Sequence, residues 1–287
     1  MPELPEVETF KRYLDSTSLH QRISSVEVRD AYVLQGISAR ELARRLKGRR
    51  FESSRRHGKH LFVQAGNELW LRLHFGMTGS LEYLAHDQAA PRTARVLFHF
   101  AKNRRLVFDD QRKFGEIGLI KNVDEFVGKC GIGPDALDIS FSQFKSMLQT
   151  HRGALKAILL NQKLIAGIGN LYADEISFRA CVHPATEAAK LSDKNLRRLF
   201  RATRYVLEKA VALKTDFDRL PKSWLLTHRG KRAKCPRCGR TLKSATIGGR
   251  TSWFCAHCQT RAYPVYPNIS SRVSAFFGAA PSASLSK

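Results

Sequence analysis

The sequence predicts an α+β protein with two domains. Apolar side chains recur at every second position in the segments before residue 130, and they recur at helical spacing after it. Four cysteines in two CxxC pairs follow the helical half. Gly131, Gly133 and Pro134 mark the boundary between the halves. A chain of 287 residues is long enough to bury two ordinary cores, and separate strand-rich and helical halves are typical of the α+β class.

The first half is expected to combine two helices with a sheet. The first helix presents an apolar stripe at Val7, Phe10 and Leu14. A second helix begins at the capping-box pattern of Ser38 and Glu41, continues through Leu42 and Leu46, and stops before Gly48. Apolar residues then alternate with polar ones, which predicts strands at Leu69, Leu71 and Leu73, at Val96, Phe98 and Phe100, and at Leu106 and Phe108 after the polar turn Lys102 to Arg105.

The second half is expected to be helical as far as the cysteines. Apolar residues recur at helical spacing from Phe141 to Leu213, in the groups Phe144, Met147 and Leu148; Leu155, Ile158 and Leu159; Leu171 and Ile176; and Leu196, Leu199, Phe200, Val206 and Leu207. The turn Ala166 to Asn170 contains two glycines before a helix, so its amides could hold a phosphate. A plain interhelical loop is the alternative. The Ser- and Ala-rich stretch from Ser270 to Lys287 is expected to be disordered.

The charge of the chain points to a polyanionic partner. Lys and Arg total 49 against 25 Asp and Glu, a net charge of +24. After Asp218 no acidic residue occurs in 69 positions that contain 13 Lys or Arg, which suits phosphates, although a solvated basic tail is the alternative. No apolar run approaches the roughly 20 residues that a membrane span requires, so no membrane partner is expected. The acidic start MPELPEVE is unlike an export or transit signal, which predicts a protein that stays inside the cell.

Four of the six cysteines have the spacing of a metal site. Cys235 and Cys238 form one CxxC pair, and Cys255 and Cys258 form another after 16 intervening residues. Such pairs can hold one tetrahedral Zn²⁺, and four thiolates leave no coordination position for water, so the metal is expected to be structural. Two redox disulfides are the alternative. His257 is expected in an exposed loop, whereas Cys130 and Cys181 are expected to be small core residues.

Several motifs together resemble the formamidopyrimidine-DNA glycosylase family, which includes the endonuclease VIII proteins. They occur in the same order as in that family and extend from residue 1 to about Gln259: MPELPEVET at residues 1–9, HGKHL at 57–61, HFGMTG at 74–79, DQRKFG at 110–115, NLYA at 170–173, and the cysteine ribbon with Gly249 and Arg250. The resemblance implies an amino-terminal β-sandwich flanked by helices over residues 1–130. It further implies a helix-two-turn-helix domain over 131–230 and a β-hairpin zinc finger over 231–262 with one Zn²⁺. The remaining residues, 263–287, are expected to form a disordered tail.

The resemblance also implies a catalytic role for the amino terminus. In the family Met1 is removed and Pro2 becomes a secondary amine that attacks C1′ of a damaged nucleotide, with β- and δ-elimination following. A terminal amine has a pKa of about 8 and is neutral more often than a lysine at about 10.4, so Pro2 suits this role. Glu3 would act as the general acid, and Glu6 would support the same site beside the DNA. The implied activity is that of a bifunctional DNA glycosylase and abasic-site lyase of base excision repair.

Further residues match the family's contacts with the extruded nucleotide. Lys59, Asn170 and Arg250 resemble its phosphate clamp, and Lys59 and Arg250 are grouped with the catalytic residues. Met77, Arg112 and Phe114 match the trio that fills the gap left by the extruded base. Lys156 is expected either to contact the lesion strand or to be solvated. The implied partner is damaged double-stranded DNA, bound by a monomer in the bacterial cytoplasm or nucleoid.

Two departures from the family bear on the substrate. The glycine-rich loop that covers an everted 8-oxoguanine in some members is shortened here to Lys214 to Pro221, and the chain extends beyond Gln259. The short loop predicts activity on abasic sites, formamidopyrimidines or hydantoins at least equal to that on 8-oxoguanine. A preference for oxidised pyrimidines, as in endonuclease VIII, is one alternative. A non-catalytic damaged-DNA-binding zinc-finger protein is another, although the intact Pro2, Glu3, Lys59, Asn170 and Arg250 argue against it.

Overall fold

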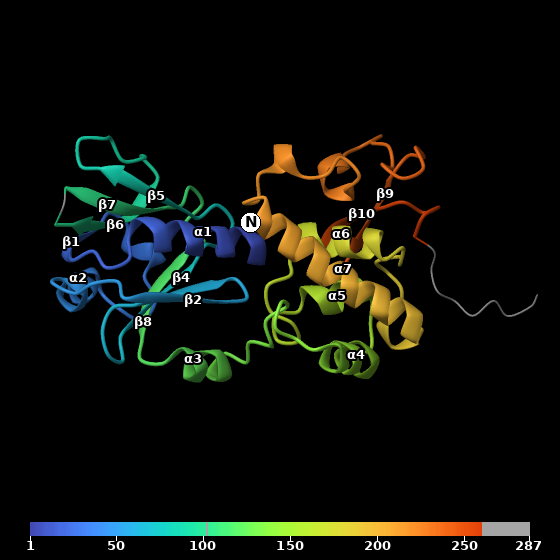
Figure 1. The fold of residues 1–287 in the computed structure, drawn as a ribbon, viewed down its shortest axis with the longest axis horizontal. Helices are drawn as coiled ribbons and strands as arrows, with labels where there is room; N and C mark the ends of the chain where they lie inside the picture. Colours follow the sequence, from blue (N-terminus) through green and yellow to red (C-terminus); the bar gives the residue numbers. More distant parts are fainter. Residues whose placement is uncertain (102, 260–287) are drawn as a thin grey trace, which may run out of the picture.

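The computed structural model describes residues 1–101 and 103–259 and contains two domains side by side, with the amino terminus between them (Figure 1). Leu4 to Ile120 form two antiparallel four-stranded sheets, ordered β1-β6-β7-β5 and β2-β3-β4-β8. The elements of this domain are α1 (Leu4–Thr17), β1 (Ile23–Val28), η1 (Ala31–Val33), α2 (Ala39–Leu46), β2 (Ser53–His57), β3 (His60–Gln64), β4 (Trp70–His74), β5 (Ser80–Ala85), β6 (Ala94–Phe100), β7 (Arg104–Asp109) and β8 (Glu116–Ile120).

One core lies between the two sheets and is closed at its edges by the helices. Phe98 and Leu106 of one sheet and Leu71 and Ile117 of the other are fully buried in this core, together with Val7 of α1. Strands with one face on a shared core and one face toward solvent show the two-residue period seen in the sequence. The β-sandwich flanked by helices is therefore confirmed.

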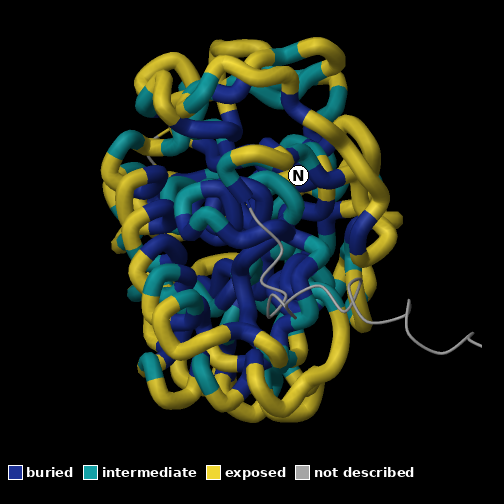
Figure 2. Tube along the Cα trace, turned by 90° about the vertical axis from the view of Figure 1, so that its right-hand side faces the viewer, coloured by how far each residue is buried: buried dark blue, intermediate teal, exposed yellow. Residues whose placement is uncertain are grey.

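The second domain packs helices around a separate core. Its elements are α4 (Phe141–Thr150), α5 (Leu155–Leu160), α6 (Asn170–Arg179), η2 (Ala188–Lys190), α7 (Asp193–Ala212), η3 (Phe217–Arg219), η4 (Leu225–His228) and the hairpin β9 (Lys243–Ile247) with β10 (Arg250–Phe254). Helix α3 (Val123–Lys129) precedes them and packs on the first domain, where Phe126 contacts His60 and Phe62. Viewed from the end of this domain, buried segments lie inside and exposed loops form most of the periphery (Figure 2). No described helix is long and apolar enough to cross a membrane.

The predicted helices occur with longer or sharper limits than periodicity gave. The first helix spans α1 from Leu4, and Ser38 caps α2 by accepting a hydrogen bond from the Glu41 amide at 3.2 Å. The reciprocal half of the capping box is not formed, because Glu41 pairs with Arg44 instead. Segment Val123–Lys129, within the half expected to be strand-rich, is helical and is capped by Asn122.

Some sequence interpretations need correction or lie beyond the described residues. Cys130 is exposed and Cys181 is half-buried, so the expectation that both are core residues is wrong. His257 is exposed, as expected. The predicted tail, residues 263–287, lies outside the described residues.

The two domains share their first residues. Leu4, at the start of α1, is fully buried in the helical core of the second domain, and its amide donates to the Gly167 carbonyl at 3.0 Å. From the second domain, Asp135 accepts the Gly58 amide at 2.7 Å and forms an ion pair with Arg56. These contacts fix the start of the chain at the domain boundary.

Candidate active site and DNA-binding surface

The Glu3 carboxylate lies at the amino-terminal end of α6. Its oxygens accept hydrogen bonds from the amides of Gly169 at 2.7 Å, Leu171 at 2.8 Å and Tyr172 at 3.3 Å. Helix amino termini hold negative groups well because unpaired amides and the helix dipole both favour them. Glu3 therefore occupies the anion site that the glycine turn was expected to offer to a phosphate, and that expectation is wrong for these amides.

The turn leaves room for Glu3 because residue 169 is glycine. A Cβ at Gly169 would lie 2.3 Å from the Glu3 Cδ atom, which is closer than real side chains approach. Gly167, at φ +110°, similarly has no space for a side chain beside Leu4. The two glycines thus allow the first residues of the chain to approach the second domain closely.

Burial changes the protonation of the two acids at this site. Glu3 is 1% exposed, and burial raises its pKa against the opposing charge of Lys59 and the three amides. Glu6 accepts hydrogen bonds from the Glu3 amide at 2.9 Å and from the Tyr172 hydroxyl at 2.7 Å. Burial and the neighbouring Glu3 carboxylate raise the pKa of Glu6 to about 7. The pair can therefore hold a proton near neutral pH.

Lys59 approaches the same acids from the turn between β2 and β3. Gly58 adopts φ +56°, where an added Cβ would lie 2.7 Å from Ala166, so glycine is required at this turn. Burial lowers the pKa of Lys59, while the charges of Glu3 and Glu6 oppose that change and Arg250 reinforces it. The predicted clamp residues Lys59 and Arg250 are thus brought close enough to interact electrostatically.

Asn170 and Arg250 begin the two elements that face this region. Asn170 is the first residue of α6, and its buried Oδ1 atom has no hydrogen-bond partner among the described residues. Arg250 is exposed at the start of β10, after the tight turn of Gly248 and Gly249 at φ +59° and +71°. The Nδ2 group of Asn170 and the exposed guanidinium of Arg250 are the donors in this region that suit phosphate oxygens.

Lys156 forms a buried ion pair. Its side chain is fully buried, and its Nζ atom donates to Asp174 at 2.6 Å and to the Thr251 carbonyl at 3.3 Å. Asp174 also accepts the Trp253 amide at 3.0 Å and contacts Arg229 at 3.1 Å. The solvated alternative is therefore wrong for Lys156, and its contact with the lesion strand stays a prediction. The cluster instead connects α5, α6 and strand β10, which carries Arg250.

A buried aspartate organises the loop that carries Arg112 and Phe114. Asp110 accepts from the Thr78 hydroxyl at 2.5 Å, the Arg112 amide at 3.2 Å and the Gly115 amide at 2.7 Å. The two predicted wedge residues are consequently displayed at the surface, with the Arg112 guanidinium 5.0 Å from the centre of the Phe114 ring.

Met77 and Phe114 are exposed, unlike ordinary core residues. Phe114 is 52% exposed and Met77 is 37% exposed, and a Cβ at Gly76 would lie 2.3 Å from the Phe114 backbone. The loops of Met77 and Phe114 are therefore in direct contact. Their exposed apolar side chains can enter a gap in a base stack.

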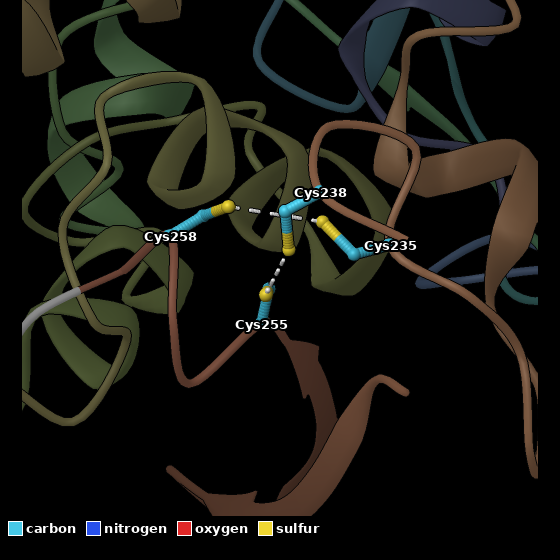
Figure 3. Close-up of side chains that lie close together, drawn as sticks. All are labelled: Cys235, Cys238, Cys255 and Cys258. Carbon is cyan, nitrogen blue, oxygen red and sulfur yellow. Dashed lines mark hydrogen bonds between the residues drawn. The ribbon is translucent and has the colours of Figure 1, made fainter. Parts of the chain in front are cut away.

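The four predicted metal ligands converge (Figure 3). The Sγ atoms of Cys235, Cys238, Cys255 and Cys258 all lie within 4.8 Å of one another, with separations of 3.9 Å for Cys235–Cys258 and 3.5 Å for Cys238–Cys255. Tetrahedral Zn–S bonds of about 2.3 Å place sulfurs about 3.8 Å apart, so the residues fit such a metal. Free thiols at this spacing exclude the two-disulfide alternative for this structure.

The shortened loop is a compact continuation of α7. The amides of Lys214, Thr215 and Asp216 donate to carbonyls of α7 and its cap, and a short 3₁₀ turn at Phe217–Arg219 follows. Lys214 and Val211 border a cavity beside Arg12 and Tyr13 of α1. The segment therefore packs near α1 as a turn.

Comparisons with known proteins agree with this arrangement. Family models describe residues 1–117 as a formamidopyrimidine-DNA glycosylase N-terminal domain, 131–220 as its H2TH domain and 233–261 as a zinc finger found in that family and in IleRS. The formamidopyrimidine-DNA glycosylase of Syntrophomonas wolfei is 35% identical over 272 residues, which cover 90% of this chain and all of that protein.

Two solved structures of DNA complexes are similar over the same length. The Lactococcus lactis formamidopyrimidine-DNA glycosylase, bound to DNA with an abasic site, is 30% identical with a TM-score of 0.82, covering 90% of this chain and 99% of that one. MutM in complex with DNA containing carbocyclic 8-oxoguanine is 29% identical with a TM-score of 0.83, covering 90% and 100%. The fold and site thus define a two-domain DNA glycosylase with a four-cysteine metal-binding finger. This chain belongs to the formamidopyrimidine-DNA glycosylase family and is an enzyme of base excision repair.

Sequence reasoning assigned no role to the residues that hold the site together. These are Asp110, Asp135, Tyr172 and Asp174, which fix the wedge loop, the Lys59 turn, Glu6 and the β10 hairpin respectively. The available signal was an acid or phenol inside or beside a quoted motif, such as DQRKFG or NLYA. A polar residue within an apolar helical pattern, such as Asp174, also indicates a buried partner.

Proposed function

We propose that this DNA glycosylase excises oxidised, purine-derived bases through a Schiff base on Pro2 and then cuts the DNA backbone by β- and δ-elimination. The Glu3 carboxyl group carries the proposal. It is buried at the amino-terminal end of α6, one residue after Pro2, where the chain enters the domain boundary. A proton donor held next to a terminal amine is the arrangement that this chemistry needs.

Removal of Met1 gives Pro2 a secondary amine as the nucleophile. Its nitrogen forms a bond with C1′ as the bond between C1′ and the damaged base breaks, and the base leaves with the electron pair and takes up a proton. Opening of the sugar ring then yields an iminium, which acidifies the C2′ proton and allows the two phosphates to be eliminated in turn.

Glu3 is proposed to protonate the ring oxygen as the ring opens. Its raised pKa supports this role, because a carboxyl group must hold a proton at the working pH to donate one. Glu6 is proposed to support the same site by keeping Glu3 and Tyr172 in place. Its direct contact with DNA stays a prediction.

Lys59, Asn170 and Arg250 are proposed to clamp the phosphates around the extruded nucleotide. The electrostatic interaction of Lys59 with Arg250 and the place of Asn170 at the start of α6 support this assignment. Two cations near each other repel unless an anion lies between them. Met77, Arg112 and Phe114 are proposed to fill the gap in the duplex, which offsets the cost of base extrusion.

The four cysteines are proposed to hold one structural Zn²⁺. When bound, the ion closes a small core in which Phe178 of α6 and Leu225 pack against Cys235 and Cys255. The hairpin with Arg250 lies between the cysteine pairs, so its position depends on this core. We also propose that the enzyme acts as a monomer in the bacterial cytoplasm or nucleoid, a setting that its bacterial relatives support.

Borohydride trapping tests the nucleophile. The protein, shown by mass spectrometry to lack Met1, is incubated with a duplex that contains an abasic site, reduced, and digested. The expected result is a covalent adduct on the terminal Pro2 peptide, with altered trapping in Pro2→Gly. An adduct on another side chain would overturn the mechanism, and no adduct at all would favour the DNA-binding-only alternative.

A substrate comparison tests the lesion preference. The compact turn at Lys214 to Pro221 supports activity on abasic sites, formamidopyrimidines or hydantoins at least equal to that on 8-oxoguanine. Single-turnover rates on matched duplexes measure this. A strong preference for 8-oxoguanine opposite cytosine would contradict it, and faster excision of oxidised pyrimidines would favour the endonuclease VIII-like alternative.

A further inference from the structure

A second basic site lies at the far end of the amino-terminal domain. A cavity of about 760 Å³ opens where β1 begins and where β6 and β7 meet, on the side away from the second domain (Figure 1). The cavity is lined by His20, Gln21, Arg22, Arg50, Tyr83, Ala101 and Arg104. The 14 residues of α1 separate it from the catalytic end of the chain by about 21 Å, at 1.5 Å per residue.

Two of its arginines face each other across a backbone bridge. Arg22 and Arg50 are partners in an isolated antiparallel bridge, where opposite Cβ atoms lie about 4.5–5.5 Å apart. Arg104 is the register partner of Phe100, which itself pairs with Ile23, next to Arg22. Like charges directly opposite each other destabilise a strand pair. The fold therefore places three exposed arginines around one cavity.

No carboxylate of residues 1–101 or 103–259 forms an ion pair with Arg22, Arg50 or Arg104. Other arginines of the same domain do have such partners, among them Arg44 with Glu41 and Arg72 with Glu116. Within the described residues, the three cavity arginines are therefore open to an added anion.

We propose that this cavity binds a small ligand with a di- or triphosphate group, such as a nucleotide. Guanidinium groups match phosphate oxygens in charge and in fork geometry, and three of them suit more than one phosphate. The volume lies within the range of about 300–1,000 Å³ that is usual for small-molecule sites. A concave site this far from Pro2 favours a compact ligand over the duplex bound for repair.

The wall beside the arginines is already ordered and could receive the rest of a nucleotide. Gln21 donates to the Tyr83 hydroxyl at 2.6 Å and also to the Thr17 carbonyl. The Tyr83 ring packs against Phe100 with 6.1 Å between ring centres. A fixed aromatic ring next to a phosphate site offers a surface for a base.

Isothermal titration with inorganic triphosphate and with ATP tests the proposal. The full-length protein is expected to bind both at low salt, and Arg22→Gln and Arg50→Gln are each expected to weaken binding about tenfold or more. Arg44→Gln removes an equal charge from an exposed position of α2 and should bind like the wild type. Incision of an abasic duplex should be unchanged in all three variants.

Thermal denaturation supplies a second measurement. Without ligand, Arg50→Gln should melt at or above the wild-type temperature at low salt, because the repulsion with Arg22 is relieved. Triphosphate should raise the melting temperatures of the wild type and of Arg44→Gln, but not those of Arg22→Gln and Arg50→Gln. Absence of binding at millimolar triphosphate, or binding by Arg22→Gln and Arg50→Gln equal to that of the wild type, would overturn the proposal. Displacement of triphosphate by an uncleavable abasic-analogue duplex would place the ligand in the DNA cleft instead. Weaker duplex binding by the variants, without triphosphate binding, would assign the arginines to polynucleotide.

Discussion

Two buried carboxylates lie against helix α6, and their charges are compensated in different ways. Glu3 accepts three backbone amides at the start of the helix, whereas Asp174, within the helix, contacts Lys156 and Arg229 and accepts one amide. Amides stabilise a negative charge without fixing it, so Glu3 can still take up a proton. Burial raises the pKa of Asp174 too, but the charges of Lys156 and Arg229 oppose that change. A buried ion pair is also costly to break. The environment of Glu3 suits proton transfer, whereas that of Asp174 suits holding α5, α6 and β10 together.

Loss of the metal site is expected to have the largest effect on DNA binding. It should disturb the hairpin that contacts Asp174 and leave the amino-terminal sheets folded. Cys238→Ser should abolish binding to an abasic-site duplex, because the hairpin with Arg250 is a two-stranded unit that is not stable by itself. Cys130→Ser, at an exposed cysteine outside the cluster, is the matched control. Gel-shift titration measures binding, and circular dichroism follows the sheets. Unfolding of the sheets in Cys238→Ser would show that the domains are not independent.

Glu3→Gln is expected to reduce base excision by about 100- to 10,000-fold, because the general acid is removed. The same change places an amide NH₂ toward backbone donors and should cost about 1–3 kcal/mol of unfolding free energy. Single-turnover excision and chemical denaturation measure the two effects. Excision within a few-fold of the wild type would remove Glu3 from the proton transfer.

Asp174→Asn should lower the free energy of unfolding more than Glu3→Gln does, and should lower the excision rate less. It leaves Lys156 buried without its charge partner, so we expect a loss of about 3–5 kcal/mol in unfolding free energy. The double variant Lys156→Met with Asp174→Asn should recover much of this loss, since neither charge remains. Urea denaturation of the single and double variants provides the comparison. Equal unfolding free energies for Asp174→Asn and the wild type would show that the ion pair does not stabilise the fold.

Gly169→Ala tests the position of Glu3 without changing its chemistry. The backbone at residue 169, with φ −129°, accommodates alanine, but the new Cβ would displace the carboxyl group. A displacement of about 1 Å can reduce a rate about 100-fold, and we expect a loss of this order in excision. Gly128→Ala is the matched control, since nothing lies within 4 Å of its Cβ position. Equal rates for the two variants would contradict tight positioning of Glu3.

Substitution of Glu6 is expected to have the smallest effect, a change in unfolding free energy that varies gradually with pH. Its pKa is about 7 in the folded protein against an ordinary 4.5, so folding favours its protonated form. The stability that it contributes is complete below about pH 4.5 and is lost as the pH rises through about 7. Relative to the wild type, Glu6→Gln should therefore gain up to about 1 kcal/mol per pH unit between pH 5 and 7. Denaturation at these two pH values measures the difference, and a constant difference would indicate an unshifted Glu6.

Local patterns in the sequence were sufficient for much of the fold and for the metal ligands. The CxxC spacing brings two thiols together within one turn, and the apolar stripe of α7 reports the face that it buries. Both properties involve residues close together in the sequence, so a periodicity or a motif can predict them. The β-sandwich and the placement of the site residues followed from the family resemblance, since pattern alone does not pair strands.

The partners of buried charges could not be predicted in this way. Arg56 meets Asp135 over 79 positions, and Glu3 meets Leu171 over 168. Lys156 and Asp174 are on different helices, so neither residue by itself distinguishes an ion pair from a solvated surface. Such contacts depend on how domains pack, and the glycine turn was interpreted as a phosphate site because its actual anion comes from the other end of the sequence.

The bond between Glu3 and helix α6 also sets an order of events during synthesis. The first residues to leave the ribosome cannot settle until residues 169–172 have emerged, which takes about 10–30 s at 5–20 residues per second. During that interval the leading methionine is accessible to an aminopeptidase. We expect a nascent chain to be trimmed readily, whereas a completed and folded precursor, with Glu3 already docked, should be a poor substrate for the same peptidase.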